Sequence, residues 1–182
     1  MNVASKSLQR DQHFMVDKSI IRKIILFANI KPNENVVEIG AGKGILTKEL
    51  AKISGKVTAI EIDKKLKPVL EKELRGFNNA TILIKNALKV DLSSDKIVGN
   101  IPYAICESLI QRLPRYRFKK AVFTVSKSFA YRLLAKPGDE NYSNLSVFSQ
   151  KNFEIKIELY VPKDAFKPKP KTNSVVISVI KK

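Results

Sequence analysis

The hydrophobic residues of this chain follow two alternating spacings, one typical of helices and one typical of strands. Residues 17–32 have the helical spacing. Ile20, Ile24 and Phe27 lie on one side of the predicted helix, and Asp17 is a suitable N-cap. Pro32 is predicted to end this helix, because proline cannot continue the hydrogen-bond ladder. The chain therefore opens with an amphipathic helix after a polar start.

Further along, short runs rich in β-branched residues alternate with segments of helical spacing. The predicted strands read "NVVEI", "KVTAIEID", "ATILIKNA", "DKIVGNI" and "KAVFTVSK". The predicted helices between and after them read "ILTKELAKI", "KKLKPVLEKEL", "ESLIQRL" and "FAYRLLA". Strands that alternate with helices form a mostly parallel sheet with helices on both faces.

The end of the chain has a different pattern. The segments "FEIKIELYVP" and "NSVVISVIKK" both alternate like strands, and only "KDAFKPKPKT" lies between them, so they predict an antiparallel pair at the edge of the sheet. "KPGDENYSN" reads as a surface loop. We expect an α/β fold with a seven-stranded sheet, in one domain over residues 1–182, with about 1–16 as an N-terminal extension.

The net charge of the chain indicates the kind of partner that it binds. The chain has 34 Lys and Arg against 17 Asp and Glu, a net charge of +17, which favours an anionic partner and nucleic acid first. Residues 112–136 contain eight basic side chains and no acidic one. The alternative is a solvated lysine-rich face, although alternating charges would fit that interpretation better.

Several classes of protein are disfavoured. No stretch reaches the ~18 to 20 apolar residues of a membrane span, and "MNVASKSLQRDQHF" lacks the apolar centre of a signal peptide, so we expect a cytoplasmic protein without a membrane partner. Cys106 is the only cysteine and His13 the only histidine, which excludes an internal disulfide and argues against a metal site.

The clearest chemical signal is a glycine-rich loop. In "VVEIGAGKGIL", Gly40, Gly42 and Gly44 follow a strand and precede a helix, where glycine permits positive φ and lets a ligand approach the backbone. Alone, this spacing also fits a structural turn. Glu61 at the end of the next strand changes the balance, because a carboxylate there can accept hydrogen bonds from both ribose hydroxyls of an adenosine ligand.

Dehydrogenases and methyltransferases share this layout, and Glu38 favours the second. An acid just before the first glycine suits a cationic ligand such as S-adenosylmethionine and would repel a pyrophosphate.

The stretch "VGNIPYAI" ends the fourth predicted strand at the same edge of the sheet. Pro102 disfavours helical backbone at Ile101, so the Ile101 carbonyl and the Asn100 amide oxygen can converge on an adenine amine and hold its lone pair toward a methyl donor. Tyr103 offers a face for stacking an extruded base. The alternative is a strand stopped by proline, with a half-buried tyrosine.

Five motifs in order resemble the ribosomal RNA adenine N6,N6-dimethyltransferases, a family that includes the small-subunit dimethyladenosine transferases and the macrolide-resistance methyltransferases. They are "QHFM", "EIGAGKGILT", "EID", "NIPY" and "VPKDAFKPKPKTNSVV". The resemblance implies a Rossmann-like class I methyltransferase fold, S-adenosylmethionine as cofactor, ribosomal RNA or a pre-ribosomal subunit as partner, a monomer, and methylation, or dimethylation, of adenine N6.

The resemblance also assigns the site. The implied catalytic residues are Asn100, Ile101, Pro102, Tyr103 and Phe166, the last with a core position as its alternative. The implied cofactor contacts are His13, Met15, Glu38, Gly40, Gly42, Glu61, Ile62, Asn86, Ala87 and Asn100.

Some positions depart from the family pattern. Asn86 stands where an aspartate is usual, Ser143 replaces a glycine, and Ser126 precedes Lys127 where a glutamine is usual. The usual C-terminal helical domain is not found before Lys182. Two other functions therefore stay open: an RNA-binding assembly factor with reduced or lost catalysis, and a DNA adenine-N6 methyltransferase.

Overall fold

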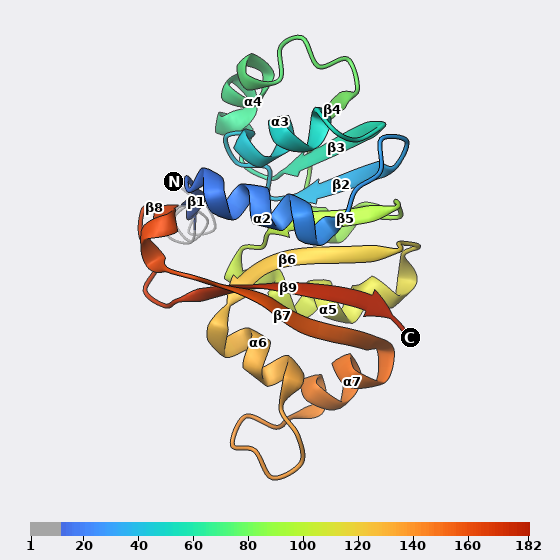
Figure 1. Ribbon diagram of the computed structural model, residues 1–182, viewed down its shortest axis with the longest axis vertical. Coiled ribbons are helices and arrows are strands. Elements are labelled where there is room, and N and C mark those ends of the chain that lie inside the picture. Colours follow the sequence, from blue (N-terminus) through green and yellow to red (C-terminus); the bar gives the residue numbers. More distant parts are fainter. Residues whose placement is uncertain (1–11) are drawn as a thin grey trace.

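A computed structural model of the chain describes residues 12–182. Its centre is a seven-stranded sheet in the order β4-β3-β2-β5-β6-β9-β7 (Figure 1). The strands are β2 (Asn35–Ile39), β3 (Lys56–Glu61), β4 (Ala80–Ile84), β5 (Lys96–Asn100), β6 (Lys120–Ser126), β7 (Phe153–Val161) and β9 (Ser174–Lys181). Strands β2 to β6 run parallel, and β9 is antiparallel to both β6 and β7. The α/β prediction with an antiparallel terminal pair is confirmed.

Helices cover both faces of this sheet. One face carries α2 (Lys18–Ala28), α3 (Ile45–Ala51) and α4 (Lys67–Glu73); the other carries α5 (Cys106–Arg112), α6 (Lys127–Leu134) and α7 (Asn144–Asn152). Short 3-10 turns fill several connections: η1 (Lys64–Leu66), η2 (Ala87–Lys89), η3 (Tyr103–Ile105), η4 (Leu113–Arg115) and η5 (Lys163–Ala165).

The two faces have separate hydrophobic cores. Phe123 and Ile177 point from the sheet into the cluster beneath α5 to α7, whereas Val122 and Val176 point into the cluster beneath α2 and α3. This two-sided burial explains why the central strands read as nearly continuous apolar runs.

A second, two-stranded sheet was not predicted. β1 (Phe14–Met15) pairs with β8 (Phe166–Lys167), with Met15 opposite Phe166. The pair lies at one end of the central strands (Figure 1). Two-residue strands from opposite ends of a sequence leave no periodicity, so the prediction of "KDAFKPKPKT" as a plain connector was incomplete.

One helix boundary needed correction, and one helix was missed. Helix α2 begins at its predicted cap, where Asp17 Oδ1 accepts the Ser19 N–H at 2.7 Å, but it ends at Ala28 rather than at Pro32. Asn29 adopts left-handed backbone (φ 47°) and closes the helix. Helix α7 was not predicted at all.

Across residues 12–182, every helix is too short or too polar to cross a membrane.

Candidate active site

A cavity of about 230 Å³ lies at the carboxyl edge of the parallel strands. Its walls come from β1, from the ends of β2, β3 and β5, from the turn after β4 and from β8. Every residue that the sequence assigned to the site lines this cavity: His13, Met15, Glu38, Gly40, Gly42, Glu61, Ile62, Asn86, Ala87, Asn100, Ile101, Pro102, Tyr103 and Phe166. Their individual roles stay predictions.

The glycine loop has the backbone that its sequence predicted. Gly40, Gly42 and Gly44 have φ of 74°, 57° and 85°, which side chains other than glycine rarely adopt. The Gly40 and Ala41 N–H groups both donate to the Ile60 carbonyl, at 2.9 and 3.1 Å. The loop is therefore tied to the end of β3, beside Glu61.

Gly99 brings this loop close to "NIPY". A Cβ atom at Gly99 would lie 2.4 Å from the Ile39 carbonyl oxygen, and one at Gly40 would lie 3.1 Å from the Asn100 carbonyl oxygen. Strands β2 and β5 therefore approach more closely than a side chain would permit. The glycine of "VGNIPY", which the sequence interpretation did not use, sets the distance between the two halves of the site.

Glu61 is fixed by two backbone donors. Its side chain is buried, Oε2 accepts the Gly42 N–H and Oε1 accepts the Asp63 N–H, both at 2.8 Å. Each carboxylate oxygen can accept a further hydrogen bond. Asp63 caps η1 by accepting the Lys65 N–H.

Glu38 is more buried than its sequence position indicated. It is 2% exposed, and its Oε2 and the buried Thr47 hydroxyl have no hydrogen-bond partner within residues 12–182. Burial raises the pKa of Glu38 to about 8, and the charge of the nearby Glu61 adds to this rise. The raised pKa favours the neutral form of Glu38 at neutral pH.

The Asn100 side chain is oriented by the N-terminal segment. Its Nδ2 donates to the His13 carbonyl at 2.7 Å, and no hydrogen bond to its Oδ1 is found in the described part of the chain. The Ile101 N–H donates to the Thr124 carbonyl at 3.0 Å, which holds this peptide in line with the sheet. Among residues 12–182, the one hydrogen-bonding contact found for the Ile101 carbonyl is a long one, 3.9 Å, with Cys106 Sγ. Both predicted acceptors are thus left with capacity for another donor.

The two candidate aromatic residues differ in exposure. Tyr103 is partly exposed, and its hydroxyl lies 3.1 Å from Ser174 Oγ. Phe166 is only 2% exposed and packs in the core beneath α2, although one side of it lines the cavity. Its core role is observed, and its contact with a target base stays a prediction.

Two further predicted residues follow β3 and β4. Ile62 is an apolar side chain that is 42% exposed at the cavity, so it is available to a ligand. Asn86 caps η2, with its Oδ1 accepting the Leu88 N–H at 2.9 Å. One lone pair of this amide oxygen is therefore already used.

Residues 12–15 close one side of the cavity. Gln12 Nε2 donates to Asp63 Oδ2 at 3.1 Å, and His13 Nδ1 lies 2.8 Å from the Pro168 carbonyl. The Phe14 ring rests on Gly42, and Lys43 Nζ lies 4.9 Å from the ring centroid. The sequence interpretation missed Phe14 and Lys43, although both lie inside motifs that it singled out.

The basic run at residues 112–136 does not form one surface. Buried strand β6 divides it, and a seven-residue strand spans about 23 Å. Lys119 lies at the amino edge, where it pairs with Glu34 and Asp95, and Arg132 pairs with Glu107. Only the part that follows β6 lies on the side of the cavity.

The family model for "Ribosomal RNA adenine dimethylase" matches residues 4–182. The chain belongs to this family. A curated relative from Methanococcus maripaludis, "Probable ribosomal RNA small subunit methyltransferase A", is 40% identical over 97% of this chain and 67% of its own length. The "Ribosomal RNA small subunit methyltransferase A" of Thermotoga neapolitana is 39% identical over 94% of this chain and 66% of its own length.

Solved structures agree with this assignment. A dimethyladenosine transferase from Plasmodium falciparum matches 93% of this chain and 64% of its own chain, with a TM-score of 0.88 and 36% identity. The 23S rRNA methyltransferase ErmE matches 93% of this chain and 70% of its own, with a TM-score of 0.83 and 29% identity. The fold is the Rossmann-like fold of class I methyltransferases. The chain spans about two thirds of the length of these relatives.

Proposed function

We propose that this member of the adenine dimethylase family transfers methyl groups from S-adenosylmethionine to adenine N6 in ribosomal RNA, in the cytoplasm. One observation carries the proposal: Asn100, with an amide oxygen open to a donor, shares a cavity with the glycine loop and Glu61. The names of its relatives support ribosomal RNA as the substrate.

The cavity residues fit S-adenosylmethionine. Gly40 and Gly42 leave the loop backbone bare, Glu61 has lone pairs for ribose hydroxyls, and Glu38 Oε2 is a buried acceptor that lacks a partner within residues 12–182. We propose that these residues bind the cofactor together with His13, Met15, Ile62, Asn86, Ala87 and Asn100. When bound, the cofactor supplies an electrophilic methyl group on a sulfonium.

In this proposal the chain's own groups act on the adenine. Asn100 Oδ1 and the Ile101 carbonyl accept hydrogen bonds from the exocyclic amine, which favours a pyramidal nitrogen whose lone pair points at the methyl group. Positive charge that develops on the nitrogen is then stabilised by two acceptors, so no strong base is needed. Tyr103 stacks on the extruded base, and Pro102 keeps the Ile101 peptide extended.

Substitution of Asn100 tests this assignment. Asn100→Ala removes one acceptor, and we expect tritiated methyl transfer to ribosomal RNA to fall about 10²- to 10³-fold, as for the loss of one preorganised transition-state contact. Asn141→Ala, in an exposed loop, is the matched control and should keep the activity of the unsubstituted chain. Undiminished methylation by the Asn100→Ala variant would contradict the catalytic role assigned to Asn100.

One observation favours an RNA-binding assembly factor as the second candidate. Asn86 is uncharged where the family pattern has a carboxylate, and its oxygen already accepts the Leu88 N–H, which predicts weaker cofactor binding. Calorimetry separates the two functions: absence of S-adenosylmethionine binding at millimolar concentration, with RNA binding retained, would favour the assembly factor.

A further inference from the structure

Two tyrosines and a lysine form an exposed cluster outside the cavity. We call Lys127, Tyr131 and Tyr160 the tyrosine platform. Tyr131 is 39% exposed and Tyr160 is 58% exposed, and their hydroxyls lie 3.2 Å apart. Lys127 Nζ lies 5.3 Å from the Tyr131 ring centroid and 5.7 Å from that of Tyr160. A cation thus sits beside two aromatic rings that leave much of their surface in solvent.

A break in strand register puts Tyr160 in this position. The pairing of β7 with β9 shifts between Ile157 and Leu159. Before the shift, Ile155 and Ile157 pack on the core beneath α6; after it, Leu159 and Val161 pack on the core beneath α2. Tyr160 is therefore turned to the α6 side, where Tyr131 lies. Such irregularities commonly redirect a side chain near a functional site.

The platform lies on the same edge of the sheet as the cavity. Ser174 at the start of β9 is opposite Ser126 of β6 and Val161 of β7, and its hydroxyl is the one that contacts Tyr103. Since adjacent strands lie about 4.8 Å apart, Val161 and Ser126 are roughly 10 Å apart across β9. Tyr160 precedes Val161 in the chain, and Lys127 follows Ser126. Both residues therefore lie within the length of a few nucleotides of Tyr103, which contacts Ser174.

The charge around the platform fits a polyanion. Lys127 forms no ion pair with any residue between 12 and 182, in contrast to Arg132 on the same helix, which pairs with Glu107. The chain after Tyr160 continues into an exposed basic segment that contains Lys167 and Lys171. Exposed aromatic rings next to unpaired lysines are the usual means by which proteins bind single-stranded nucleic acid, with rings on bases and ammonium groups on phosphates.

We propose that the tyrosine platform stacks an unpaired base of the substrate RNA next to the target adenine, with Lys127 neutralising an adjoining phosphate. The inference rests on the proposed function, because it takes the RNA to be the substrate of the neighbouring cavity. The platform gives this chain a second hold on its substrate and sets how the strand enters the site.

The test compares RNA binding by matched variants at one fixed salt concentration. The probe is a fluorescein-labelled transcript of the 3′ part of small-subunit ribosomal RNA, followed by anisotropy. We expect the double variant Tyr131→Ala/Tyr160→Ala to bind at least about fivefold more weakly, the smallest effect typical for loss of one stacked base. Tyr131→Phe/Tyr160→Phe keeps both rings and should bind within about twofold of the unsubstituted chain. Tyr142→Ala, at a tyrosine that is also 39% exposed, is the surface control.

Cofactor calorimetry on the same variants identifies the cause of any change. Unchanged S-adenosylmethionine affinity in the alanine double variant, with weaker RNA binding, supports the platform. RNA binding equal to that of Tyr142→Ala overturns it, even where the unsubstituted chain methylates RNA. Weaker binding only to protein-containing subunits also overturns it, because the partner is then a protein. If the unsubstituted chain neither binds nor methylates RNA, the proposed function fails as well.

Discussion

Two carboxyl groups in the cavity have opposite surroundings. Glu61 accepts two backbone N–H groups, one on each carboxylate oxygen. Glu38 is 2% exposed, and its Oε2 has no partner in the described chain, which suits a neutral acid. We infer that Glu61 accepts hydrogen bonds from neutral hydroxyls, whereas the buried carboxyl group of Glu38 is suited to a cationic ligand.

The raised pKa of Glu38 makes stability depend on pH. The ordinary value is 4.5 and the folded value is about 8, so the folded state holds a proton that the unfolded state has lost between these pH values. Stability from this group is therefore complete below pH 4.5 and falls by up to about 1.4 kcal/mol per pH unit as the pH rises toward 8.

Urea unfolding of Glu38→Gln should reveal this dependence. We expect the unfolding free energy of the variant, relative to that of the unsubstituted chain, to increase steadily from pH 5 to 8, because glutamine cannot ionise. Glu154→Gln, at an exposed strand position, is the control and should show no such gain. A constant difference between Glu38→Gln and the unsubstituted chain would mean that Glu38 does not titrate in this range.

At the residue scale, the sequence predicted which side chains lie at the cavity, but it did not predict their hydrogen-bond partners or protonation states. The glycines, Glu61 and Asn100 could be predicted because their spacing follows the edge of a parallel sheet. The partner of Asn100 could not, because the His13 carbonyl comes from a segment 87 residues away. The protonation state of Glu38 could not either, because it depends on burial by residues from several elements.

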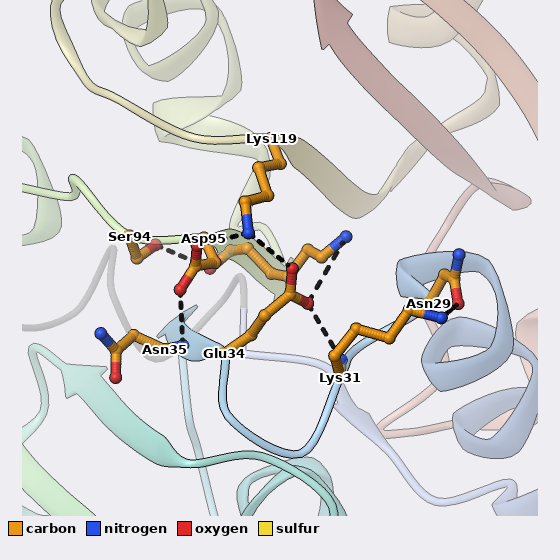
Figure 2. Close-up of polar contacts among 8 residues, drawn as sticks. Asn29, Lys31, Glu34, Asn35, Ser94, Asp95 and Lys119 are labelled. Carbon is orange, nitrogen blue, oxygen red and sulfur yellow. Dashed lines mark hydrogen bonds and ion pairs between the residues drawn. The ribbon is translucent and has the colours of Figure 1, made fainter.

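At the scale of elements, the two edges of the sheet have different tasks. The carboxyl edge holds the cavity, and the amino edge holds a network of charges (Figure 2). Glu34 before β2 pairs with Lys119 before β6 at 3.1 Å and with Lys96 of β5 at 3.7 Å, and it accepts the Lys31 N–H. Burial raises the pKa of Glu34, but these donors and cations outweigh it, so the net shift is downward. The network holds the starts of three strands together.

Removal of Glu34 should destabilise the fold without touching the cavity. Glu34→Ala leaves Lys96, which is 7% exposed, without this carboxylate, and we expect a loss of about 3 kcal/mol in unfolding free energy. Glu71→Ala breaks the exposed pair with Lys67 and should cost less than about 1 kcal/mol. Equal losses in the two variants, measured by urea unfolding, would contradict a structural role for the network.

The prediction of elements from the sequence missed a helix whose buried face is polar. Helix α7 was missed because "NLSVFSQKN" lacks a clear apolar face. Ser146 and Ser149 occupy that face and donate to the Arg132 and Leu133 carbonyls at 2.6 and 2.8 Å. These bonds satisfy the last turn of α6, so the packing is specified by hydrogen bonds that no hydrophobic pattern reveals. The parallel strands, which bury β-branched residues on both faces, were predicted correctly.

For the whole molecule, charge and topology act together. The net charge of +17 attracts RNA, but β6 divides the basic run, so only the residues on the cavity side can hold a substrate there. The cavity, the tyrosine platform and the basic segment after Tyr160 all lie on that side. The relatives are about half as long again as this chain.

The most direct test of the central claim is the identity of the methylated atom. The chain is incubated with small-subunit ribosomal RNA and S-adenosylmethionine that carries a deuterated methyl group, and the RNA is digested and analysed by mass spectrometry. The proposed site predicts deuterated methyl groups on adenine N6, in mono- or dimethyladenosine. Label found only on another base, on another atom or on no nucleoside would contradict it.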